Sequence, residues 1–423
     1  MSKLFLMALC FAVLRSAVCT GSVLGDAAAS MKAGEWRDLQ ANGMDYGMLY
    51  YDVNGDYTNP VTDYSDNLSW DPTGNEALYV GSGNYYTYKF LRYSAVTNTW
   101  RSDPNLPACM KNRGCNWHAF DNGSMDEVNR KYYFINSSGL WTYSVATSQW
   151  SSALALPSNM AQGVGSAMEY FPSLNGLASV IGGTVTVYNL TTHQVTVAAT
   201  GLVMAGYNQV AAYSPTFRKF FFGGDAAGNF YSMDSAKKVV KVANAPGLLH
   251  ENNSTLTTDP ATGKILYLGD PQSSNAGKLF VYNPDSDTWQ SAGNAPQTGH
   301  ALATPVSNEG VVLFLFPATY KTYIYKHAAG GTALEKGTLP SAISLSVSPN
   351  PIASHARFTL GTELKAGPAT LALYDCKGRK IATLAASTQG VFNWSTAKAP
   401  AGVYLVKAEL KGKSATKWIT VVK

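Results

Sequence analysis

Three of the six histidines stand at comparable points of the chain, each a short distance before a turn-containing segment: His118, His250 and His300. Imidazoles bind metals at about 2 Å, so a metal or catalytic site needs at least two of them to converge. Polar and aromatic residues at similar points could complete a ligand site, and these are Asn67, Trp117, Asn208 and Glu251. The three histidines lie at different distances from the turns that follow them, which favours hydrated polar residues over a metal centre. We therefore expect a ligand site without a metal or a cofactor.

Other chemistry-bearing residues are few. Asp66, Asp121 and Glu251 could serve glycoside chemistry, but sequence alone does not pair carboxylates in space. The sequence has no nucleophile elbow, P-loop or HExxH motif, so whether the protein is an enzyme stays open. Cys109 and Cys115 are close enough to close a short loop as a disulfide, whereas a metal site on this pair would need two further ligands.

The elements that position these residues form a repeat. A Tyr followed seven residues later by Trp recurs in YSAVTNTW (93–100), YSVATSQW (143–150) and YNPDSDTW (282–289). Weaker copies start at Tyr188, Tyr231 and Tyr325, and the spacing of the six tyrosines is 43 to 51 residues. Each tyrosine follows a short apolar segment. That apolar segment in turn follows a segment that ends in a turn with Pro, Asp or Gly.

This order predicts four short antiparallel strands in each of six units, which is the size of a propeller blade. No segment keeps a 3.6-residue period, so we expect almost no helix. The repeated Tyr and Trp should pack between blades, because one sheet cannot bury both of its faces alone. Trp36 resembles the Trp of an outer strand but precedes every unit, and the unit at Tyr325 lacks a Trp. We therefore expect the strand around Trp36 to complete the sixth sheet and close the ring.

The two ends of the chain differ from its middle in charge. The net charge of +5 is too small to indicate nucleic acid as a partner, and only 14% of the residues are charged. Residues 341–423 carry a net +8, residues 20–340 a net −5, and residues 1–19 a net +2. Residues 1–19 have a basic start, an apolar run and an A-x-A-like end, which predicts a signal peptide and export. The apolar run is too short for a transmembrane anchor, and no later segment is long enough.

The middle of the chain resembles kelch-type β-propellers. The apolar strands with glycines (Tyr79-Val80-Gly81, Phe222-Gly223-Gly224, Tyr267-Leu268-Gly269) and the spaced Tyr and Trp carry the resemblance, which covers roughly residues 34–335. It implies a six-bladed propeller over residues 20–340 with a ligand site where the innermost strands begin. Kelch-type enzymes include a copper-radical oxidase and sugar epimerases, but no spacing here reproduces their motifs.

Residues 341–423 alternate apolar and polar residues and predict a small antiparallel β-sandwich. The segment closely resembles the type A C-terminal sorting domain of the type IX secretion system. The matching residues are Pro349, Asn350, Pro351, Tyr374, Asp375, Gly378, Arg379, Gly402, Tyr404 and Lys417. The resemblance implies export across the outer membrane of a Bacteroidota-like bacterium by that machinery. A permanent Ig-like binding module is the alternative interpretation.

Two functions remain open from the sequence. The first is a secreted or cell-surface propeller that binds glycan or protein through one face, because its loops are rich in Asn, Ser, Tyr and Trp. The second is an extracellular carbohydrate-active enzyme, of oxidase or epimerase type, with its site where the innermost strands begin. A convergence of His118, His250 and His300 would favour the enzyme.

Overall fold

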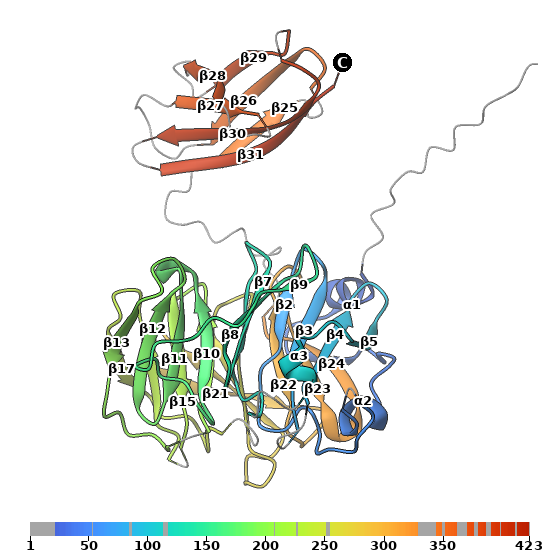
Figure 1. Cartoon of the computed structure of the whole chain (residues 1–423), viewed down its shortest axis with the longest axis vertical. Helices are drawn as coiled ribbons and strands as arrows, with labels where there is room; N and C mark the ends of the chain where they lie inside the picture. The colour runs from blue at the N-terminus through green and yellow to red at the C-terminus, as the bar shows by residue number, and fades with distance from the viewer. Residues whose placement is uncertain are drawn as a thin grey trace, which may run out of the picture. The chain divides into compact units, whose positions relative to one another are not determined.

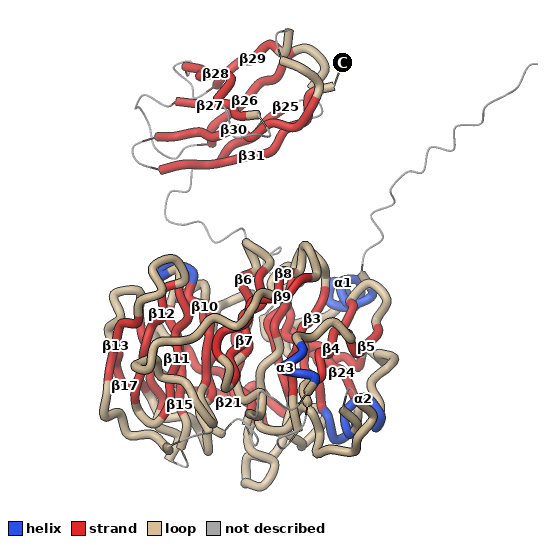
Figure 2. Tube along the Cα trace, in the orientation of Figure 1, coloured by secondary structure: helices blue, strands red, loops and turns tan. Residues whose placement is uncertain are grey.

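The computed structural model describes residues 22–52, 54–83, 87–112, 117–206, 208–225, 227–250, 254–328, 344–348, 352–361, 370–375, 380–385, 391–397, 399–410 and 413–422. The chain divides into two compact units between residues 334 and 335. Strands make up most of the regular structure (Figure 2). The helices are short, as expected, although the sequence did not predict the first of them: α1 (Val23–Ser30), α2 (Tyr46–Tyr50), α3 (Ala108–Lys111) and the 3₁₀ turns η1 (Pro172–Leu174) and η2 (Pro317–Thr319).

The described residues of the first unit form six four-stranded antiparallel sheets, which follow one another along the chain (Figure 1). Sheet 1 contains β2 (Ser69–Asp71), β3 (Glu76–Gly81), β4 (Lys89–Ser94) and β5 (Thr99–Asp103). Sheet 2 contains β6 (Gly123–Asp126), β7 (Lys131–Asn136), β8 (Gly139–Ser144) and β9 (Gln149–Trp150). Sheet 3 contains β10 (Ala167–Phe171), β11 (Gly176–Ile181), β12 (Thr184–Asn189) and β13 (Val195–Ala199).

The other three sheets have the same strand order. Sheet 4 contains β14 (Val210–Ser214), β15 (Lys219–Gly223), β16 (Phe230–Met233) and β17 (Val239–Val242). Sheet 5 contains β18 (Thr255–Thr258), β19 (Ile265–Leu268), β20 (Lys278–Asn283) and β21 (Thr288–Asn294). Sheet 6 contains β22 (Leu302–Val306), β23 (Val311–Phe316), β24 (Lys321–Lys326) and, as its outer strand, β1 (Glu35–Asp38).

The first strands of the six sheets close a ring. Each of β2, β6, β10, β14, β18 and β22 contacts the first strand of the next sheet, and β22 contacts β2. Parallel bridges join Asn67 to Ala303 and Asp121 to Ala167. Because these innermost strands run in the same direction, all six begin at one end of the ring axis and finish at the other. The arrangement is propeller-like, and Figure 1 shows the orange strands of sheet 6 beside the blue strands of sheet 1.

The pairing of β1 with β24 joins the start of the first unit to its last sheet. Trp36 lies opposite Tyr325, with 4.6 Å between the ring centroids, and also packs on Phe314. The strand around Trp36 therefore completes sheet 6, as expected. Since β24 would otherwise present an unpaired edge, this pairing protects that edge from fraying.

The repeated Trp side chains connect neighbouring sheets. The indole N–H of Trp100 donates to Thr322 Oγ1 at 2.8 Å. The indole of Trp150 donates to the Asn105 carbonyl at 2.8 Å, and that of Trp289 to the Ala243 carbonyl at 3.0 Å. Each acceptor belongs to the preceding sheet of the ring or to the connection that leaves it. The repeated aromatic residues thus pack between sheets, as predicted.

The fourth repeat was assigned two residues too early. Strand pairing places Met233 opposite Phe220 and Val239, the position that the repeated tyrosine holds in the other sheets. Tyr231 lies opposite Phe222 and Lys241 instead. Residues two apart point to the same face of a strand, so spacing alone could not distinguish these two buried side chains.

The described strands of the second unit form two antiparallel sheets. One contains β25 (Ser344–Ser348), β26 (His355–Gly361) and β29 (Val391–Ser395). The other contains β28 (Lys380–Ala385), β27 (Thr370–Tyr374), β30 (Gly402–Leu410) and β31 (Lys413–Val421). Phe358 and Phe392 of the first sheet share one buried cluster with Leu371, Leu373 and Val406 of the second.

Candidate functional site

Of the residues proposed from sequence, those that the structure describes lie at or just before the starts of the innermost strands. His118 is buried, its Nδ1 lies 3.3 Å from the Ser82 carbonyl, and its ring packs on Tyr64 at 4.2 Å. His250 is half-buried, and its backbone N–H donates to Ser254 Oγ at 3.0 Å. Burial lowers the pKa of both imidazoles. Within the described residues, no three His, Cys, Asp or Glu side chains gather in a way that could hold a metal ion.

The remaining predicted site residues have structural contacts of several kinds. Asn67 donates from Nδ2 to the Gly123 carbonyl at 3.0 Å, and the carbonyl of Trp117 accepts the hydroxyl of Tyr88 at 2.6 Å. His300 is half-buried, and so is Asn208, whose φ of +73° places it in the left-handed region. Glu251 lies outside the described residues. A ligand site formed jointly by these residues stays a prediction.

Two fully buried carboxylates close the ring at this end. Asp66 Oδ2 accepts the backbone N–H of Leu256 at 2.8 Å, and Asp121 Oδ2 accepts that of Ala211 at 2.8 Å. Each bond connects strands of two sheets that are not neighbours, so the carboxylates lie inside the ring. Burial raises the pKa of Asp121 to about 7. Asp66 and Asp121 are therefore not exposed for the glycoside chemistry considered from sequence.

A cavity of about 300 Å³ lies at the other end of the ring, where the innermost strands finish. We call it the axial cup. Residues from all six innermost strands, or from the turns after them, line it. Of the residues proposed from sequence, Asn67 is among those that line it.

One position of the innermost strand recurs around the axial cup. The equivalent residues, defined by their partners on the second strand of each sheet, are Ser69, Ser124, Glu169, Ala212, Thr257 and Thr304. All six line the cup. Five are small or hydroxyl-bearing, so the sixth, Glu169, places one carboxyl among hydroxyl groups. Glu127, in the turn after β6, adds a second carboxyl.

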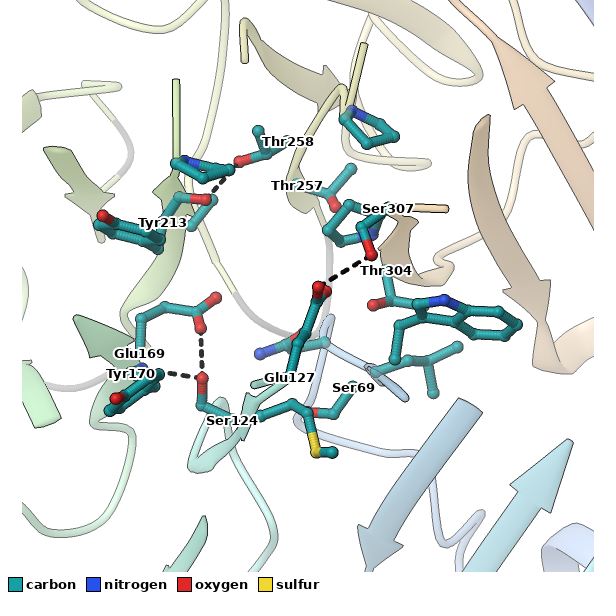
Figure 3. A pocket seen from close by; sticks show the side chains of 18 of the residues that line it. Ser69, Ser124, Glu127, Glu169, Tyr170, Tyr213, Thr257, Thr258, Thr304 and Ser307 are labelled. Carbon is teal, nitrogen blue, oxygen red and sulfur yellow. Dashed lines mark hydrogen bonds between the residues drawn. The ribbon is translucent and has the colours of Figure 1, made fainter. Parts of the chain in front are cut away.

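Both carboxyl groups turn toward the open centre of the cup (Figure 3). Glu169 Oε2 accepts the hydroxyl of Ser124 at 2.6 Å, and Glu127 Oε2 accepts that of Ser307 at 2.9 Å. Burial and then the nearby charge of Asp121 raise the pKa of Glu169 to about 8. Burial, together with the charges of neighbouring aspartates, raises the pKa of Glu127 to about 7. Each group can therefore gain or lose a proton near neutral pH.

Rings surround these polar groups. The aromatic and proline side chains that line the cup are Trp70, Tyr170, Tyr213, Pro172, Pro215, Pro260 and Pro305. Trp70 is fixed by its indole N–H, which donates to Asn308 Oδ1 at 2.7 Å. Burial is the largest cause that raises the pKa of Tyr170 and of Tyr213 to about 12, so both phenols stay neutral. The cup thus offers apolar ring faces, hydroxyl groups and two titratable carboxyls to a small ligand.

Sequence reasoning missed Glu127 and Glu169. A signal was available, because only 14% of the chain is charged and Glu169 interrupts a position that is otherwise small or hydroxyl-bearing. Recognising this signal requires the register between the first and second strands of each sheet, because that register defines which positions are equivalent. The histidines proposed from sequence lie toward the opposite end of the axis.

Some of the predicted sorting residues can be located in the second unit. The Tyr404 hydroxyl donates to the Pro400 carbonyl at 2.7 Å, Tyr374 and Asp375 are half-buried, and Gly402 begins β30. Lys417 is exposed on β31. The others lie outside the described residues: Pro349, Asn350, Pro351, Gly378 and Arg379.

Cys109 in α3 is disulfide-bonded. Its predicted partner, Cys115, lies outside the described residues, so the Cys109–Cys115 pairing stays a prediction. None of the helices in the described part of the chain is long and apolar enough to cross a membrane.

No family model matches the chain, and no curated protein matches it. Among solved structures, it is similar to PorZ, an essential bacterial surface component of the type IX secretion system of Porphyromonas gingivalis. That match has 12% identity and a TM-score of 0.38, and covers 88% of this chain and 61% of that one. The chain therefore spans less than two thirds of that relative. It is also similar to an auxiliary nutrient binding protein from Bacteroides ovatus, with 10% identity, a TM-score of 0.46 and coverage of 67% and 74%.

Proposed function

We propose that the protein is an exported, cell-surface six-bladed kelch-like propeller that binds a glycan through the axial cup. The observation that carries the proposal is the cup itself, where six strands finish around hydroxyl groups, carboxyls and ring faces. Its volume of about 300 Å³ is at the lower end for small-ligand sites. Between the two ligand classes considered from sequence, this favours a sugar over a protein surface.

The chemistry of the lining supports a sugar. Ser69, Thr257 and Thr304 can donate and accept hydrogen bonds, as sugar hydroxyls do. Pro172, Pro215 and Pro260 add apolar rings to the lining, against which the C–H face of a pyranose can pack. A ligand that satisfies both kinds of surface must itself be amphipathic and small.

A glycan array probed with the purified protein tests this proposal, with a variant that fills the cup. Ala212→Leu adds volume at a lining position, and we expect it to reduce glycan binding at least about tenfold. The matched control Ala236→Leu lies in an exposed turn and should bind as the unaltered protein does. Equal binding by Ala212→Leu would place the ligand elsewhere, and absence of binding to every glycan would reject the proposal.

We further propose that residues 341–423 are a type IX sorting domain and that the protein reaches the surface of a Bacteroidota-like bacterium through that machinery. The ordered sorting motifs and the two sheets of the second unit support this. A chain that lacks residues 341–423 should be made but retained in the periplasm. Fractionation of the producing cells tests this, and surface display without the segment would reject it.

The pair of cup carboxyls also favours a second candidate function, a carbohydrate-active enzyme. Glu127 and Glu169 have pKa values of about 7 and about 8, a range suited to general acid–base chemistry. Incubating the array-positive glycan with the protein and analysing the products would separate binding from turnover. An unchanged glycan would reject this candidate.

A further inference from the structure

The charges that line the axial cup are all of one sign. Asp126, Glu127 and Glu169 are among the lining residues, and no Lys, Arg or His is among those that the structure describes there. Arg130 is close in sequence, but it pairs with Asp71 at 2.6 Å. The cup therefore contains acidic groups whose charges are not neutralised by a basic side chain of its lining.

The three acids are not equivalent. Asp126 closes the turn after β6, since its Oδ1 accepts the backbone N–H groups of Val128 and Asn129. Glu127 and Glu169 each accept a hydroxyl hydrogen bond on Oε2, and Glu169 also accepts the backbone N–H of Tyr213, while both carboxyls turn into the cup. Burying such groups costs free energy that a ligand of opposite charge can offset.

We propose that the axial cup binds a sugar that carries a protonated primary amine, and that Glu127 and Glu169 pair with the ammonium group. The inference rests on the proposed function, in which the cup is the ligand site. An ammonium donates three hydrogen bonds and forms charge-assisted bonds with carboxylates, which are stronger than bonds between neutral groups. A ligand with a phosphate or carboxylate group would meet like charge.

Binding of an amine should release protons, because the empty cup favours the neutral form of its acids. The charge of Asp121 disfavours the carboxylate form of Glu169, whereas hydrogen bonds from the Ser124 hydroxyl and the Tyr213 backbone N–H favour it. Glu127 faces Asp71, Asp126 and the hydroxyl of Ser307, and the Arg130 partner of Asp71 is the nearby cation. The phenols of Tyr170 and Tyr213 stay neutral. An ammonium stabilises the carboxylate forms, so affinity for an amine should rise from pH 6 to pH 7.5.

A neutral sugar should show a weaker dependence. A protonated carboxyl can donate a hydrogen bond to a sugar hydroxyl, and after the proton is lost the carboxylate can accept one from it instead. The steepness of the rise in affinity with pH therefore distinguishes the two ligand classes independently of absolute affinity.

Isothermal titration calorimetry of the purified protein with glucosamine, glucose, N-acetylglucosamine and n-butylamine tests the inference. We expect glucosamine to bind at least about tenfold more tightly than glucose or N-acetylglucosamine, with proton release measured in buffers of different ionisation enthalpy. Equal affinity for glucosamine and glucose would overturn the amine inference and leave the proposed function intact. Equal affinity for n-butylamine and glucosamine would support the amine and contradict the sugar.

Two charge-removing variants complete the test. Glu169→Gln and Glu127→Gln keep the shape of the side chain and should each reduce the preference for glucosamine at least about tenfold. Asp285→Asn removes a carboxylate from an exposed turn and should leave the preference unchanged. A glucosamine preference that survives in both Gln variants, with their thermal unfolding confirming that they fold, would overturn the inference.

Discussion

The two ends of the ring axis use buried carboxylates in different ways. Where the innermost strands begin, Asp66 and Asp121 accept backbone N–H groups from sheets that are not their neighbours. Where these strands finish, Glu127 and Glu169 accept hydroxyl hydrogen bonds and face a cavity. The first pair thus joins sheets deep inside the ring, whereas the second pair joins sheets and also lines a cavity. The same chemical group, a buried carboxyl, thus either lies within the ring or borders a cavity according to what the ring places opposite it.

The largest expected effect lies at Asp66, where the innermost strands begin. Asp66 is fully buried, and its carboxylate accepts the backbone N–H of Leu256. Asp66→Ala removes this acceptor and leaves a cavity inside the ring. We expect the free energy of unfolding to fall by about 2–4 kcal/mol. Urea unfolding followed by intrinsic fluorescence measures this change. Asp66→Asn keeps an acceptor oxygen and should lose less than half as much, and a loss under about 0.5 kcal/mol in the Ala variant would contradict the structural role.

At the cup, removing a carboxyl should stabilise the protein. The pKa of Glu169 is 4.5 in the unfolded chain and about 8 in the folded one, so the folded state binds the proton more tightly. The resulting stabilisation is complete below about pH 4.5 and is lost as the pH rises through about 8. Gln resembles the protonated acid at every pH. Glu169→Gln should therefore raise the melting temperature at pH 9 by at least about 2 °C and leave it nearly unchanged at pH 4.5.

Differential scanning calorimetry between pH 4.5 and pH 9 follows this difference. Asp285→Asn serves as the control, because its side chain lies in an exposed turn and should shift the melting temperature little at either pH. A Glu169→Gln protein less stable than the unaltered one at pH 9 would show that the carboxylate is itself stabilising.

His118, near the end of the ring where the innermost strands begin, gives a pH dependence of the opposite sign. Burial lowers the pKa of its imidazole below 6.5, so the folded state binds this proton less tightly than the unfolded chain. Its contribution to stability is present above pH 6.5 and is lost as the pH falls. His118→Gln should abolish the fall in stability at low pH and lower the free energy of unfolding at pH 8 by about 1 kcal/mol. It should change glycan affinity less than about twofold. A larger loss of affinity in the array assay would place the ligand site near His118, His250 and His300 and contradict its location in the cup.

Much of the first unit could be predicted because its signals are local and repeated. The Tyr-to-Trp spacing predicted the hairpins. Trp36, which precedes every repeat, predicted the closing strand, and this residue lies opposite Tyr325. The error at Tyr231, where Met233 holds the equivalent position, arose because both side chains lie on one face of β16. Residue spacing therefore predicts where a strand lies. It does not predict which residue of that strand occupies the equivalent position between neighbouring sheets.

The site could not be predicted in the same way, because it depends on side chains that meet across the axis. Nothing near Asp66 in sequence indicates that Leu256 donates to it. Whether an end of the axis is open depends on the combined size of six residues from six sheets. The ring of hydroxyl and small residues interrupted by Glu169 became visible only after strand register had aligned the repeats.

The smallest expected effect concerns the hydroxyl groups that hold the cup acids. Ser307→Ala removes the hydrogen bond to Glu127 Oε2, a bond that lowers the pKa of this buried acid. We expect the pKa of Glu127 to rise above its present value of about 7, with a stability change of about 0.5–1.5 kcal/mol. Carbon-13 NMR titration of labelled Glu carboxyls measures the shift, and Ser124→Ala provides the matched test at Glu169. If neither pKa rises, hydroxyl contacts do not set the charge of the cup, and burial with the neighbouring charges must set it.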